Sequence, residues 1–93
     1  MCRNIRPLFN LDPPTSPAEV RDAALQYVRK ISGSGKPSVA NAAAVERAVA
    51  EVTAASQRLL DELVTSAPPR DRAVLAAQAR ARAATRYATT SPA

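Results

Sequence analysis

The sequence predicts an all-α protein, a three-helix bundle with an extended N-terminal arm. Three observations support this prediction: alanine supplies about half of the hydrophobic residues, only two glycines occur among 93 residues, and helix start and stop signals divide the chain into three segments. Alanine favours the helix because ordering it costs no side-chain entropy. We expect helices at about residues 16–32, 38–65 and 69–87, in a single small domain that spans residues 1–93.

The first helix has clear start and stop signals. Ser16 is placed to cap its N-terminus, Pro17 suits the first helical position, and Glu19 completes a capping box with Ser16. Gly33 suits the left-handed conformation that commonly follows the last residue of a helix. We therefore expect the helix over residues 16–32 to end at this glycine.

The first fourteen residues predict an extended arm rather than a disordered end. Prolines at positions 7, 13 and 14 exclude a helix interior from this segment. A disordered tail is usually polar, whereas this segment is rich in apolar side chains. We expect residues 1–14 to lie across the helices and to bury these side chains: Ile5, Leu8, Phe9 and Leu11.

The second and third helices are predicted from their apolar and small-residue faces. The second, over residues 38–65, repeats apolar positions at alternating spacings of four and three, a seam that needs a partner helix. The seam residues are Val45, Val49, Val52, Ser56, Leu59 and Leu63. The third, over residues 69–87, has a face of small residues that we expect to pack against the second: Val74, Ala77, Ala81, Ala84 and Ala88. Residues 89–93 are expected to form a frayed tail.

Residue composition excludes several classes of function. The chain contains no histidine and one cysteine, Cys2, so an internal disulfide and histidine-dependent triads or zinc sites within one chain are excluded. No apolar run approaches the ~18 residues of a membrane span, and the N-terminus lacks a secretory signal. We therefore expect a soluble cytoplasmic protein without membrane contact, and we expect no cofactor and no metal.

The stretch Gly33–Ser38 (GSGKPS) is similar to the end of a phosphate-binding loop but lacks essential parts of one. A Walker A loop needs a glycine where this chain has Lys30 and a hydroxyl residue where it has Pro37. The stretch is better explained as a helix-to-helix turn in which Gly33 ends one helix and the Ser38 hydroxyl caps the next. A simpler anion site remains a hypothesis, because helix N-termini bind anions. Its candidate residues are Arg29, Lys30, Lys36 and Ser38.

Cys2 is the candidate nucleophile that the sequence singles out. Removal of Met1 would leave Cys2 with both a free amine and a thiol, a pair that can act as base and nucleophile. Arg3 and Arg6 would favour its thiolate, which is also a soft metal ligand. No motif supplies a partner base or an oxyanion hole. We therefore expect Cys2 to be inert, and we keep a Cys2-dependent enzyme or redox/metal protein as an alternative.

Several segments along the chain are typical of one known family. They are MCRNIRPLFN, the PP before the first helix, AALQYVRKISG, KPSVAN, and RLLDEL followed by APPRDR. Through these segments the chain resembles, over nearly its whole length, the short prokaryotic proteins catalogued as domain of unknown function 2277. The resemblance implies a small all-helical protein. It implies no activity and no functional residues, because the family has no assigned function.

Three hypotheses about function follow. The first is a non-enzymatic basic helical module that binds a protein partner or a second copy of itself, and its formal charge of +5 would attract an acidic partner. The second is weak, sequence-independent nucleic-acid binding, although stacking aromatics and a DNA-binding motif are missing. The candidate residues for contact with nucleic acid or a partner are Arg80, Arg82, Arg86, Arg3 and Arg6. The third is the Cys2-dependent alternative.

Overall fold

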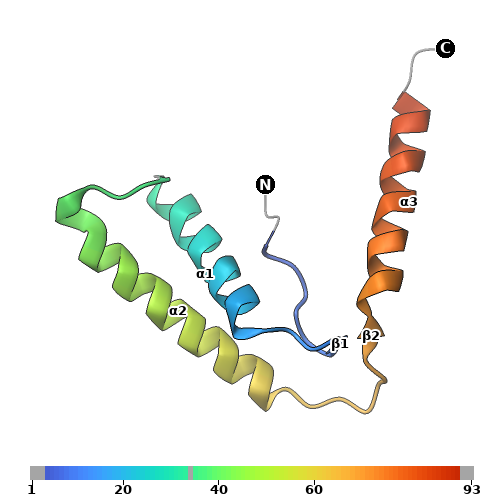
Figure 1. Cartoon of the computed structure of the whole chain (residues 1–93), viewed down its shortest axis with the longest axis horizontal. Coiled ribbons are helices and arrows are strands. Elements are labelled where there is room, and N and C mark those ends of the chain that lie inside the picture. Colours follow the sequence, from blue (N-terminus) through green and yellow to red (C-terminus); the bar gives the residue numbers. More distant parts are fainter. Residues whose placement is uncertain (1–3, 34, 91–93) are drawn as a thin grey trace. The chain divides into compact units, whose positions relative to one another are not determined.

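The computed structural model describes residues 4–33 and 35–90, and it is mainly helical (Figure 1). Its contacts divide the chain into two compact units. The first unit comprises the described residues of Met1–Phe9 and Thr15–Ser66, and the second comprises Asn10–Pro14 and the described residues of Ala67–Ala93. Each unit is described by itself below.

Helix α1, Pro17–Ser32, begins and ends where the sequence predicts. The Glu19 amide donates to Ser16 Oγ at 3.2 Å, and the Ser16 amide donates to Glu19 Oε1 at 2.9 Å, so the capping box is present. At the other end Gly33 adopts φ 72°, and its amide donates to the Arg29 carbonyl at 3.1 Å. This left-handed cap ends the helix.

Helix α2, Ala42–Glu62, is shorter than the predicted helix over residues 38–65. A single 3₁₀ turn, η1 (Val39–Asn41), precedes it. The expectation that the Ser38 hydroxyl caps this helix is wrong, because its side chain makes no capping hydrogen bond. Instead the Asn41 amide donates to the Ser38 carbonyl at 3.0 Å, the tighter bond of a 3₁₀ turn. At the C-terminus Leu63 leaves the helix in an extended conformation.

The core of the first unit lies between α1 and α2. Val20, Ala24 and Val28 of α1 are buried, as is Val49 of α2, which is 2% exposed. The partly buried side chains that pack on this cluster are Leu25, Val45, Ala48 and Val52. The first half of the predicted α2 seam therefore faces α1.

The N-terminal segment of the first unit lies along α1 through polar contacts. The Asn4 amide donates to Gln26 Oε1 at 2.8 Å, and Arg6 pairs with Glu19 at 3.4 Å. The Thr15 hydroxyl donates to the Leu8 carbonyl at 2.6 Å. The predicted burial of apolar side chains is found in part: Leu8, Phe9 and Leu11 are partly buried, whereas Ile5 is 40% exposed.

The second unit contains a small parallel sheet. The prediction of an all-α fold is therefore only partly correct. Strand β1 (Leu11–Asp12) pairs with β2 (Arg70–Asp71), with Leu11 opposite Arg70. The Arg70 amide donates to the Asn10 carbonyl at 2.9 Å. Asn10 has φ 58°, and its side-chain amide donates to the carbonyls of Ala67 and Pro68. Pairing with β1 holds Arg70 and Asp71 in an extended conformation.

Helix α3, Arg72–Thr90, consequently starts three residues later than predicted. Asp71 Oδ1 accepts hydrogen bonds from the amides of Ala73 at 2.7 Å and Val74 at 3.2 Å, the pattern of an N-cap. Arg72 Nε donates to the Pro13 carbonyl at 2.7 Å. The helix continues through residues 89–90, which the sequence predicted to fray, because no proline or glycine interrupts it there. Residues 91–93 of the predicted tail lie outside the described residues.

The substitution Gly33→Ala should destabilise the first unit, whereas Gly35→Ala should not. A methyl group added at either glycine would meet open space, but Gly33 alone of the two has a positive φ. Alanine at φ 72° costs about 1–2 kcal/mol, and at an unstrained position it leaves stability unchanged or raises it by about 0.4–1 kcal/mol. Thermal unfolding followed by circular dichroism checks the difference. Equal melting temperatures for the two variants would contradict the cap.

Candidate functional site

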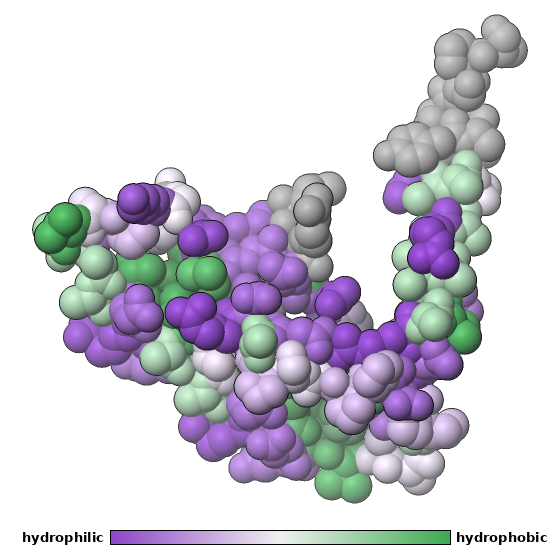
Figure 2. Space-filling model, viewed as in Figure 1, coloured by the Kyte–Doolittle hydropathy of each residue, from purple (hydrophilic) through white to green (hydrophobic). Residues whose placement is uncertain are grey.

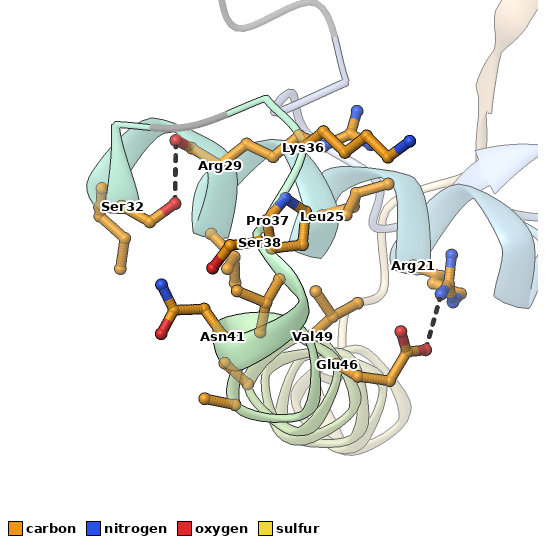
Figure 3. Close-up of a pocket in the computed structure, with 15 residues that line it drawn as sticks. Arg21, Leu25, Arg29, Ser32, Lys36, Pro37, Ser38, Asn41, Glu46 and Val49 are labelled. Carbon is orange, nitrogen blue, oxygen red and sulfur yellow. Dashed lines mark hydrogen bonds and ion pairs between the residues drawn. The ribbon is translucent and has the colours of Figure 1, made fainter.

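A groove of about 870 Å³ opens between the C-terminal half of α1 and the first turns of α2 (Figure 3). It belongs entirely to the first unit. Val28 and Val49, 4% and 2% exposed, lie at its bottom. The other apolar lining residues are Leu25, Ile31, Pro37, Ala44, Val45 and Ala48.

The groove exists because the side chains that face it are small. On the α2 side, Ala44 and Ala48 each offer one methyl group toward α1. Alanine favours the helix but fills little space between two helices, so the groove stays open where these residues line it, beside the cluster on which Leu25 packs. Figure 2 shows apolar surface among polar side chains over this end of the first unit. Ile31 is 67% exposed, and Val39, beside the groove, is 98% exposed.

The charged residues of the groove are mainly basic. Arg29 and Lys36 lie beside one another near the turn that joins α1 to α2 (Figure 3). Arg21 forms an ion pair with Glu46 at 3.5 Å. Both members of this pair are largely exposed, so it contributes little stability. The lining therefore combines three cations with one carboxylate. This edge attracts anionic groups while the floor remains apolar.

The structure brings together three of the four predicted anion-binding residues. Arg29, Lys36 and Ser38 all line the groove. Lys30 instead lines a neighbouring hollow of about 720 Å³, together with Asn4. Arg29 and Leu25 line both hollows. Anion binding by these residues remains a prediction.

The other candidate residues are divided between the two units. Arg80, Arg82 and Arg86 lie on α3 of the second unit, whereas Arg6 belongs to the first and pairs with Glu19. Arg3 and Cys2 lie outside the described residues, so the predictions made for them stay predictions. A common surface for the five arginines therefore stays a prediction.

Among the described residues, no three histidine, cysteine, aspartate or glutamate side chains gather as metal ligands would. None of the described helices combines the length and apolar character needed to cross a membrane. The groove itself offers cations, hydroxyls and apolar surface, with Glu46 as its carboxylate. This set of groups is suited to binding.

Sequence reasoning identified Arg29 and Lys36 of this site but missed Arg21 and the groove itself. The signal that could have revealed the groove is the run of alanines at 42–44 followed by Ala48, which gives α2 small side chains at two of the positions that line the groove, Ala44 and Ala48. A heptad-like seam shows which positions face inward. It does not show whether the facing side chains are large enough to meet.

A family model described as "Uncharacterized conserved protein (DUF2277)" matches residues 1–78. The chain belongs to this family. The matched region includes every residue that lines the groove. It ends before Arg80, so Arg80, Arg82 and Arg86 of α3 lie outside it. Searches of curated proteins and of solved structures found no match.

Proposed function

We propose that this member of the domain of unknown function 2277 family is a non-enzymatic interaction module whose α1–α2 groove binds an acidic segment of a partner protein. One observation supports the proposal above the others: an apolar floor and a basic edge occur in the same groove. Apolar surface provides affinity for apolar side chains, and the basic edge selects partners that carry carboxylates.

The charge of the groove favours an acidic segment over the other occupants. A second copy of the chain would bring the same cations, among them Arg29 and Lys36, to the shared surface, where like charges repel. The phosphates of a nucleic acid would pair with the cations, but a nucleic acid has no aliphatic side chains to cover the apolar residues of the groove. No aromatic residue lines the groove to stack on a base. An amphipathic segment with carboxylates satisfies both parts. Helices that bind in grooves commonly combine these features.

Arg29 and Lys30 provide a matched pair for testing the proposal. Both are cations in the last turn of α1, where each interacts favourably with the helix dipole, but only Arg29 lines the groove. The probe is a fluorescein-labelled 16-residue amphipathic helical peptide with leucines on one face and glutamates on the other. Arg29→Glu should weaken its binding about tenfold or more, whereas Lys30→Glu should change the dissociation constant by less than about threefold, as expected for a rim charge. Fluorescence anisotropy at 100 mM salt measures both.

Two further probes separate the competing occupants. A peptide with lysines in place of the glutamates should not bind, and a labelled duplex DNA should bind more weakly than the acidic peptide. Equal affinity for acidic and basic peptides would overturn the proposal, as would equal effects of the two charge reversals. DNA binding that survives Arg29→Glu would favour the α3 arginines as a nucleic-acid surface.

The proposal includes a role for α3 in the fold. The three-helix bundle that the sequence predicts, with α3 as its third helix, is part of this proposal. Leu59 and Leu63 are 56% and 43% exposed at the C-terminal end of α2.

A further inference from the structure

The floor of the groove indicates what kind of side chain the bound segment carries, an inference that rests on the function proposed above. The apolar residues that line the groove are aliphatic, and no aromatic residue is among the lining residues. Val28 and Val49 form the bottom, so the groove reaches the hydrophobic core of the first unit. An occupant that fills the groove therefore extends that core.

Size favours an aromatic side chain over an aliphatic one. The groove has a volume of about 870 Å³ and is open to solvent, so a larger side chain that occupies it gains more dispersion contacts with its walls. Ala44 and Ala48, which line the groove on the α2 side, are small, so an occupant meets little side-chain volume there. A phenyl or indole group buries about 150–250 Å², more than a leucine does.

The basic edge also suits a ring. A guanidinium group can stack on an aromatic face and can pair with a carboxylate at the same time. Arg29 lines the groove together with Leu25 and Val28, and its side chain extends beside that of Lys36 (Figure 3). No aromatic residue is among the lining residues of the groove, so the ring in this inference is one that the partner supplies.

We infer that the acidic partner segment carries an aromatic anchor, phenylalanine or tryptophan, within one helical turn of a carboxylate. The ring occupies the groove above Val28 and Val49, and the carboxylate lies at the edge formed by Arg29 and Lys36. Anchors of this kind dominate the affinity of many protein interfaces because they fill pockets and exclude water.

Three peptides test the anchor. They share the acidic 16-residue sequence and differ at one central position of the apolar face, which is alanine, leucine or tryptophan. The tryptophan peptide should bind about tenfold or more tightly than the alanine peptide and about threefold more tightly than the leucine peptide. The protein contains no tryptophan, so a blue shift of the peptide emission reports directly on burial of the indole ring.

Ala44 and Ala43 provide matched variants for the position of the ring. Both are exposed and adjacent on α2, but only Ala44 lines the groove. Ala44→Phe should fill the groove, abolish the preference for tryptophan and remove the blue shift, whereas Ala43→Phe should leave both unchanged. Circular dichroism confirms that each variant is folded. In the wild-type protein, nuclear Overhauser effects should connect the indole protons with the methyl groups of Val28 and Val49, and this measurement needs no variant.

The outcomes distinguish the two proposals. If the leucine and tryptophan peptides bind equally, the aromatic anchor is wrong and the acidic-segment function stands. If no acidic peptide binds at all, both proposals fail. If Ala43→Phe removes the preference as fully as Ala44→Phe, the ring does not bind in this groove.

Discussion

Val49→Asp is expected to unfold the α1–α2 hairpin. Val49 is 2% exposed and contacts the cluster that holds the two helices together. A carboxylate at this position is either buried without a partner or protonated, and either state costs several kcal/mol. Small domains are stable by only about 5–15 kcal/mol, and this core contains few buried side chains. The far-ultraviolet circular dichroism signal should therefore fall sharply at 25 °C, and the cooperative thermal transition should disappear.

Val39→Asp is the matched control for this experiment. The same substitution is made at a valine that is 98% exposed in the turn before α2. Exposed substitutions away from special features usually change stability by less than about 0.5 kcal/mol, so this variant should melt at nearly the wild-type temperature. If both variants melt together, Val49 is not the centre of the core.

Asn10→Val should destabilise the second unit by about 2–4 kcal/mol, from backbone strain at a β-branched residue and the loss of two hydrogen bonds. Asn10 has φ 58°, a conformation that asparagine tolerates and valine does not. Its side-chain amide also donates to the carbonyls of Ala67 and Pro68. Amide hydrogen exchange measures the result locally: the amides of Arg70 and Val74 should exchange faster, while those of the α1 core should not change.

Asn10→Gly separates the two causes. Glycine adopts a positive φ without strain but cannot donate the hydrogen bonds. Exchange at Arg70 should therefore lie between the wild-type and Asn10→Val rates. Identical rates in the glycine and valine variants would show that the hydrogen bonds alone hold this segment.

The sequence allowed α1 to be predicted to the residue, because all of its signals are local. Ser16 and Glu19 lie one turn apart, and Gly33 ends the helix through its own backbone conformation. The start of α2 was less predictable. The Lys36–Ser38 segment before it is compatible with both an α-helical turn and a 3₁₀ turn. Which of the two forms depends on the hydrogen bond that the Ser38 carbonyl accepts.

The β1–β2 pair could not be predicted in this way. Each strand has two residues, too few for an alternating pattern, and the partners Leu11 and Arg70 are far apart in the sequence. The contacts around the pair run from side chains to backbone carbonyls, such as Arg72 to Pro13, and sequence patterns do not reveal such contacts.

The candidate site was partly predictable for a related reason. The cations near the turn were identified from their closeness in sequence to the start of the second helix. Arg29 and Lys30 differ by about 100° around α1, and of these two only Arg29 lines the groove. Which cations share a surface depends on the placement of α2 against α1. That placement follows from the packing of Val28 and Val49, which the positions of the charged residues alone do not reveal.

The pairing of residues 10–14 with the segment that begins α3 affects how the protein can be dissected. Residues 10–14 belong to the second unit but are flanked on both sides by segments of the first. A fragment that stops at Ser66 would retain β1 without its partner strand, and a fragment that starts at Ala67 would lack the Pro13 carbonyl to which Arg72 donates. Neither product of a single cut is a complete unit, so truncated forms should be less stable than the corresponding parts of the intact chain.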